Sequence, residues 1–188
     1  MTSSSLGITR RGLLGAFAAT AVTAAPTFPN AAGFLRGAGD IRSISRYSGR
    51  TGERLNMIYW IEGEYIGEAV KEVNYFMRDW RQDEARQMDT RTIDIIAASH
   101  RLLDTKEPFT LLSGYRTAKT NAMLRSRSSG VAKKSLHMVG KAADLRVSGR
   151  SVSQIARAAA SCSAGGVGRY SGSNFVHVDC GPIRTWGR

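Results

Sequence analysis

Two histidines and one aspartate in this 188-residue chain have the types and the setting of a metal site. His137 and Asp144 lie in the segment SLHMVGKAAD, and His177 lies in the late segment NFVHVDCG. Gly140, between the first two, permits a turn that brings their side chains together. Two imidazoles and one carboxylate suit a catalytic zinc ion, which takes three protein ligands and leaves a fourth position to water. We therefore expect His137, Asp144 and His177 to bind Zn²⁺.

The segment around His177 also predicts a second acidic group at the same site. In a strand, successive side chains point to opposite faces, so Val176 and Val178 should enter the core while Phe175, His177 and Asp179 face the other way. His177 and Asp179 are then about 7 Å apart along the strand. Asp179 can either take a proton from an attacking water or bond to the ring N–H of His177. We expect Asp179 to be the general base.

Four further side chains are candidates for holding a substrate. Arg116 follows the apolar run PFTLLSGY, and a guanidinium at the end of a strand can bind a carboxylate or stabilise an oxyanion. We therefore expect Arg116 to serve in both catalysis and substrate binding, although the alternative is an ordinary surface arginine. Tyr115 and Tyr170 are expected to be packing residues that also line a cleft, and Ser135 to hydrogen-bond within the turn before His137.

Short elements must position these residues. Alternation and β-branched or aromatic composition predict strands, and one-sided apolar spacing predicts helices. The glycines at 165, 166 and 168 are expected to break regular structure. The predicted strands are 53–62, 108–115, 144–147 and 174–180, and the predicted helices are 66–80, one starting at Asp89 or Thr90, 117–125 and 151–161. Interleaved short strands and helices predict an α+β fold with a mainly antiparallel central sheet and flanking helices.

The N-terminal segment has the layout of an export signal. Arg10 and Arg11 precede an apolar, alanine-rich run that small residues follow, which resembles a twin-arginine signal. The run is too short for a typical membrane span. We expect a signal peptide over 1–32, with cleavage after Ala25 or Ala32, a linker over 33–45 and a folded domain that holds the zinc site over 46–188. An uncleaved N-terminal anchor is the alternative. Export by the twin-arginine route predicts a periplasmic location.

The charge of the chain indicates what kind of partner it binds, and its cysteines bear on metal ligation and disulfide formation. The formal charge of +12, from 27 basic and 15 acidic residues, favours an anionic partner such as a cell-wall polymer. The basic residues are scattered and form no nucleic-acid motif, so we expect no nucleic-acid partner. We also expect the protein to be a monomer. Of the two cysteines, Cys162 and Cys180, the spacing suggests no sulfur-ligated metal. They can pair in an oxidising compartment only if their Cα atoms lie close, which the sequence leaves open.

Several motifs resemble a known family. The pattern SxHxxGxAxD is similar to the signature of the zinc D-Ala-D-Ala carboxypeptidases and related murein peptidases, which share the lysostaphin/D-Ala-D-Ala/hedgehog fold. A closer resemblance, to the murein endopeptidase K-like branch, covers residues 45–188. It rests on RDWR (78–81), SGYRT (113–117), TNAMLR (120–125), GVAKKSLHMVGKAADLRV (130–147), GGVGRY (165–170) and FVHVDCGPIRTW (175–186).

The resemblance implies a zinc ion held by His137, Asp144 and His177, and hydrolysis of an amide bond in peptidoglycan stem peptides or cross-links. Two positions depart from the pattern. The carboxypeptidase relatives carry an acid where this chain has Asn174, and the branch shows a histidine where this chain has Arg50. Asn174 motivates the alternative of a non-catalytic cell-wall binding module that retains a structural metal site. Endopeptidase and carboxypeptidase action, and D,D and L,D cross-links, stay open at this point.

Overall fold

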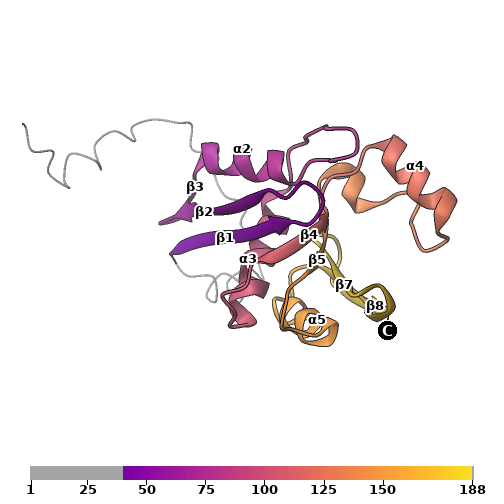
Figure 1. Cartoon of the computed structure of the whole chain (residues 1–188). Helices are drawn as coiled ribbons and strands as arrows, with labels where there is room; N and C mark the ends of the chain where they lie inside the picture. The colour runs from indigo at the N-terminus through magenta and orange to yellow at the C-terminus, as the bar shows by residue number, and fades with distance from the viewer. Residues whose placement is uncertain (1–39, 188) are drawn as a thin grey trace, which may run out of the picture.

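Eight short strands form one mixed sheet in residues 40–187, the part of the chain that the computed structural model describes (Figure 1). The strands lie in the order β3-β2-β1-β4-β5-β7-β6-β8. Their bounds are β1 Ile41–Ser48, β2 Arg54–Ile61, β3 Glu64–Tyr65, β4 Phe109–Ser113, β5 Ala142–Arg146, β6 Gly166–Tyr170, β7 Phe175–Asp179 and β8 Arg184–Gly187. Only the β1–β4 and β6–β8 pairs are parallel. The predicted α+β fold with a mainly antiparallel sheet is therefore confirmed.

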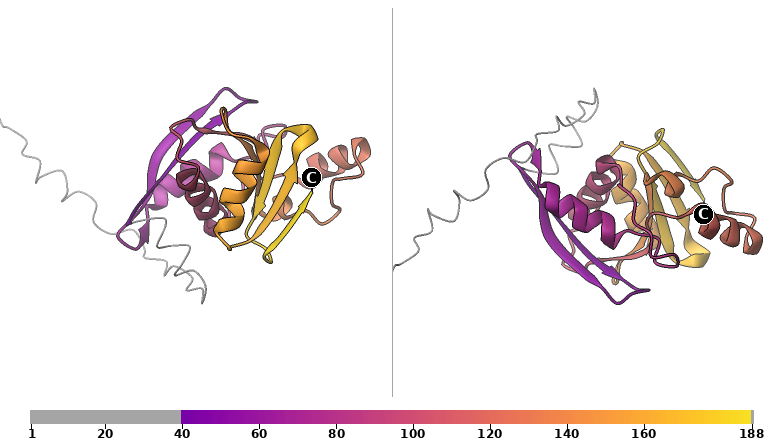
Figure 2. Two further views of the ribbon diagram at one scale, coloured as in Figure 1. Left: turned by 90° about the horizontal axis from the view of Figure 1, so that it is seen from below. Right: turned by 90° about the horizontal axis from the view of Figure 1, so that it is seen from above.

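The helices are α2 (Gly67–Phe76), α3 (Thr90–Leu102), α4 (Ala118–Arg127) and α5 (Val152–Ser161). Both views in Figure 2 place α3 and α5 between the β1–β2 pair and the C-terminal strands, because the sheet curves around them. Two short 3₁₀ turns, η2 (Leu136–Val139) and η3 (Ser171–Ser173), precede β5 and β7. The apolar core fills the concave side, and α4 lies apart from it (Figure 1).

The face of β7 that looks away from α3 and α5 carries the polar residues of interest. Val176 and Val178 are fully buried in the core, as their alternation predicted. His177 and Asp179 consequently project from the opposite face. On the neighbouring strand β5, Asp144 is the direct cross-strand partner of His177. Strand pairing alone therefore brings two residues far apart in the chain to one place.

Local capping explains where three helices begin. The Asp89 side chain accepts a hydrogen bond from the backbone N–H of Arg91 at the start of α3. Thr117 caps α4 in the same manner, and Ser151 forms a reciprocal capping box with Gln154 at the start of α5. The start of α3 at residue 89 or 90 and the Ser151 cap were both predicted from the sequence.

Three expectations about elements were wrong, and one strand was missed. The linker expected over 33–45 overlaps β1, whose residues 41–45 pair with β2, so the folded domain begins before residue 46. The helix expected over 66–80 ends at Phe76. The glycines at 165–168 were expected to break regular structure, but Gly166 and Gly168 lie inside β6. Strand β8 was not predicted at all.

The signal peptide expected over 1–32 lies outside the described residues. Among the residues that the structure describes, no helix has the length and apolarity needed to cross a membrane. Cys162 and Cys180 are both buried and both free. Burial raises the pKa of each thiol, which keeps the sulfur in its less reactive protonated form.

Candidate metal centre

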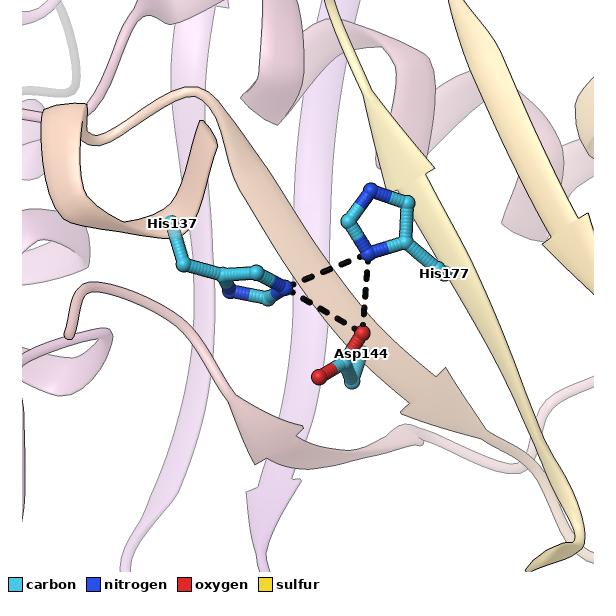
Figure 3. A group of neighbouring side chains, drawn as sticks. All are labelled: His137, Asp144 and His177. Carbon is cyan, nitrogen blue, oxygen red and sulfur yellow. Dashed lines mark hydrogen bonds and ion pairs between the residues drawn. The ribbon is translucent and has the colours of Figure 1, made fainter. Parts of the chain in front are cut away.

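Three separate elements bring His137, Asp144 and His177 together. His137 comes from η2, Asp144 from the middle of β5 and His177 from the middle of β7 (Figure 3). Gly140 ends η2 with φ +69°, a left-handed conformation that favours glycine, and so directs the chain into β5. One ligand atom from each side chain lies within 4.8 Å of the other two. The sequence prediction that these three side chains converge is confirmed.

The separations between the three facing atoms fit a tetrahedral ion. His137 Nε2 lies 3.2 Å from His177 Nδ1 and 3.3 Å from Asp144 Oδ1, and His177 Nδ1 lies 3.0 Å from the same oxygen. Ligands bound to zinc at about 2.0–2.1 Å in a tetrahedron stand about 3.3 Å apart. The three side chains therefore have the donor atoms and the spacing expected of a site that binds a small divalent cation.

The opposite side of each ring is held by an acceptor. His137 Nδ1 lies 2.7 Å from the carbonyl oxygen of Gly114, and His177 Nε2 lies 3.0 Å from Asp179 Oδ2. Each of these outer nitrogens therefore donates its proton away from the cluster. When the ring is neutral, its inner nitrogen has a lone pair that points at the shared centre. Such outer partners are typical of histidines that bind metals.

The charge states of Asp144 and His137 suit a cation. Burial alone would raise the pKa of Asp144, but His137, His177 and Arg116 outweigh it and hold that pKa well below the usual range. For His137, burial lowers the pKa of the imidazole more than Asp144 raises it. Burial would lower the pKa of His177, but Asp144 and Asp179 outweigh it and raise that pKa. Because a metal needs an ionised carboxylate and neutral imidazoles, binding of a cation would displace a proton from His177.

Asp179 is fully buried and is surrounded by donors. Its Oδ2 accepts from His177 and, at 2.7 Å, from Arg184. Its Oδ1 accepts from the backbone N–H groups of Gly166 and Gly181, at 3.2 and 2.8 Å, and from the other terminal nitrogen of Arg184. Both carboxylate oxygens are therefore engaged, and the one nearest the cluster fixes the orientation of His177.

Arg116 reaches the cluster from the segment after β4. Its Nε donates to the Ser113 hydroxyl at 2.7 Å, and one terminal nitrogen donates to Asp144 Oδ2. Arg116 thus neutralises the carboxylate oxygen that faces away from the two histidines. The sequence placed Arg116 near the site, and the structure places it in direct contact with a candidate ligand.

An open cleft of about 650 Å³ leads to the cluster. Tyr170 lines the cleft, as the sequence predicted, and so do Arg116 and Ser135. The Ser135 side chain makes no capping hydrogen bond in the turn before His137, although such a bond was expected. Tyr115 does not line the cleft: its side chain is buried, and its hydroxyl donates to Glu84 at 2.9 Å. The expectation that Tyr115 contacts substrate was therefore wrong, because the residue after β4 turns toward the loop that follows α2.

The sequence reasoning missed two cleft residues on β8. Arg184 pairs with Asp179, and the Trp186 ring lies 5.3 Å from the His177 ring, centroid to centroid. Trp186 also donates its indole N–H to the Tyr170 hydroxyl at 3.0 Å. Both lie in the segment FVHVDCGPIRTW, one of the motifs that resemble the family.

The fold and the cluster together define an α+β protein with a candidate metal centre that opens into a substrate-sized cleft. A family model described as peptidoglycan L,D-endopeptidase MepK matches residues 36–186 of the chain. The chain belongs to this family.

Two curated relatives agree with that assignment. The chain is 44% identical over 136 residues to the peptidoglycan L,D-endopeptidase MepK of Escherichia coli strain K12, an alignment that covers 72% of this chain and 75% of that protein. It is 39% identical over 137 residues to the probable peptidoglycan L,D-endopeptidase MepK of Haemophilus influenzae, with 72% and 74% of the two chains covered.

Proposed function

We propose that this protein is a zinc-dependent peptidoglycan endopeptidase that acts outside the cytoplasm. The observation that carries the proposal is the convergence of His137, Asp144 and His177 at one end of an open cleft, in a chain of the MepK family. The names of the relatives narrow the bond to an L,D linkage, which the sequence left open.

His137, Asp144 and His177 would hold the ion through two nitrogens and one carboxylate oxygen, a ligand set that zinc shares with other hydrolases. When bound, zinc supplies a Lewis acid that polarises an amide carbonyl and lowers the pKa of a water molecule. The outer contacts of the two histidines, to the Gly114 carbonyl and to Asp179, keep both rings oriented before any ligand arrives.

Arg116 is the residue best placed to bind the reacting part of the substrate. Within the described residues, its hydrogen bonds use Nε and one terminal nitrogen, so its second terminal nitrogen is available to a substrate. A guanidinium beside the cluster can donate to a substrate carboxylate or to the negative charge that develops on a carbonyl oxygen.

Asp179 is better suited to positioning than to proton transfer. The sequence favoured a general base, but both oxygens accept from groups of the protein, and the side chain is fully buried. We therefore assign Asp179 the role of holding the Nε2 proton of His177, so that Nδ1 stays free for the ion. Variants at this position separate the two roles, as described in the Discussion.

The proposed location outside the cytoplasm rests on the N-terminal sequence and on the substrate. Arg10 and Arg11 precede an apolar run in the arrangement of a twin-arginine signal. Peptidoglycan lies beyond the cytoplasmic membrane, so a hydrolase of it must be exported, and the periplasm is the compartment that both features support.

The test is product analysis on defined cross-linked muropeptides by mass spectrometry, together with the zinc content of the protein. Wild type should carry about one zinc per chain and cut an L,D cross-link, and a chelator should abolish cleavage until zinc is restored. His177→Ala should lose both zinc and activity. His100→Ala is the matched control, because His100 lies on α3 and bonds to the Glu107 carbonyl outside the cluster.

A protein that binds zinc and isolated sacculi but releases no peptide would overturn the proposal. That outcome would favour the non-catalytic binding module instead.

A further inference from the structure

The walls of the cleft carry an excess of positive charge. Five basic side chains line it, against two acidic ones, Asp144 and Asp179. The basic side chains are Arg50, Arg81, Arg116, Lys134 and Arg184. Such an excess in a concave site concentrates anionic ligands there.

Two of the five cations are already paired. Arg116 forms an ion pair with Asp144, and Arg184 forms one with Asp179. Because these pairs use both acids of the cleft, the unbalanced charge belongs to Arg50, Arg81 and Lys134. Within the described residues, none of these three makes an ion pair.

Arg50 and Arg81 both lie over the ring of Trp80. The guanidinium of Arg81 lies 4.2 Å from the centre of the Trp80 ring, and that of Arg50 lies 5.8 Å from it. Arg50 comes from the turn between β1 and β2, whereas Trp80 and Arg81 come from the turn after α2. Two separate loops therefore bring two positive charges, both lining the cleft, to one aromatic ring.

The proximity of like charges has an electrostatic consequence. Burial lowers the pKa of Arg81, and although Asp79 raises it, Arg50, Arg116 and Arg127 lower it further. Like charges destabilise one another unless an anion lies between them, and a carboxylate accepts two parallel hydrogen bonds from a guanidinium. The Trp80 ring makes cation–π contacts with both guanidiniums but cannot neutralise their charge.

We propose that Arg50 and Arg81, supported by Trp80, form a carboxylate-binding subsite that recognises an acidic group of the peptide substrate away from the bond that is cut. The proposal deepens the function proposed above, since stem peptides keep free carboxylates beside their amide bonds. Lys134, on the loop before Ser135, adds a third positive charge to the same cleft. The His–Asp–His cluster would act on the amide, while this subsite selects chains that carry the acid.

The test compares two synthetic stem tetrapeptides that differ only in charge, one with free carboxylates and one with carboxamides. Dissociation constants are measured by calorimetry with zinc-loaded protein. Wild type should prefer the acidic peptide by about tenfold, the effect of one partly exposed charge-assisted pair. Arg50→Ala with Arg81→Ala should lower that preference severalfold, to the part that Arg116 contributes, and Arg50→Lys in place of Arg50→Ala should retain more of it. High salt should weaken the preference in wild type.

Arg157→Ala is the control for net charge, because Arg157 is exposed on α5, away from the cleft. It should leave the tenfold preference unchanged. A double variant that still discriminates as wild type does, with an unaltered unfolding curve, would overturn the subsite. If wild type discriminates between the peptides but cuts no cross-link, the proposed enzymatic function fails while the subsite stands. If it cuts cross-links without discriminating, the subsite fails alone.

Discussion

Asp179→Asn is the most informative single substitution at the candidate metal centre. Asparagine keeps the shape of the side chain but replaces one acceptor oxygen by an NH₂ donor. Placed at Oδ2, that donor would face His177 and Arg184; placed at Oδ1, it would face the N–H groups of Gly166 and Gly181. In either orientation of the amide, the buried NH₂ group therefore faces other hydrogen-bond donors and has no acceptor.

The expected cost follows from these contacts. Outer partners of ligating histidines contribute about 10–100-fold to metal affinity, or about 1.4–2.7 kcal/mol. Asparagine can keep a weakened bond to His177, so we expect a loss of zinc affinity near tenfold. The buried donors left unsatisfied should also lower the free energy of unfolding by about 1–3 kcal/mol.

Zinc affinity can be measured by competition with a chromophoric chelator, alongside hydrolysis at saturating zinc. Asp83→Asn is the matched control, because Asp83 is an exposed acid that also pairs with an arginine, Arg78. Saturating zinc should restore most of the activity of Asp179→Asn. If zinc affinity is unchanged while hydrolysis at saturating zinc falls more than about a hundredfold, Asp179 transfers protons and the positioning role is refuted.

Three further outcomes are expected. Gly168→Ala should lower the free energy of unfolding by about 1–3 kcal/mol and reduce activity, because the added Cβ would lie 2.6 Å from the Trp186 ring; Gly172→Ala, which meets nothing within 4 Å, should do neither. Zinc at a hundredfold excess over its dissociation constant should raise the free energy of unfolding by about 2.7 kcal/mol in wild type, and calorimetric scans with and without zinc will show whether it does. Burial would raise the pKa of Asp79, but hydrogen bonds from Thr117 and neighbouring groups hold that pKa below its usual value. The ionised carboxylate therefore adds to the free energy of unfolding above about pH 4, and this contribution is lost as the pH falls. Urea unfolding of Asp79→Asn should accordingly show a deficit of about 1–3 kcal/mol at pH 7 that narrows at pH 3.

The alternation of apolar residues in β7 was enough to predict which way the site residues point. Val176 and Val178 are strongly apolar and flank His177. When both valines are buried, the imidazole must project from the opposite face of the strand. The convergence with His137 and Asp144 was inferred from residue types, and no local pattern could have given the 3.0–3.3 Å separations.

Strand β1 escaped prediction because its buried face is partly charged. Arg42, Ile44 and Arg46 all point inward, so the strand lacks the usual alternation of apolar and polar residues. Arg42 is compensated by Asp94 at 3.0 Å. Burial lowers the pKa of Arg46 to about 9. A buried arginine is stabilised by residues far away in the sequence, such as Asp94 for Arg42, so the local sequence pattern cannot predict its burial.

Strand β6 was misread for a different reason. Its glycines were taken as breaks, but the space beside them is filled by other side chains. A Cβ at Gly166 would collide with Asp179 and Arg184, and one at Gly168 would collide with Trp186. Glycine is required there because the site packs directly against the strand backbone.

The pairing of Asp144 with His177 across β5 and β7 makes the site depend on strand alignment. Sliding one strand past the other by a single position would turn His177 toward α3 and α5 and expose the valines that flank it. Such a chain would lose a ligand and much of its core in the same event. Misaligned molecules would therefore be inert rather than poorly controlled hydrolases, a safeguard of value in an enzyme that cuts the wall protecting its own cell.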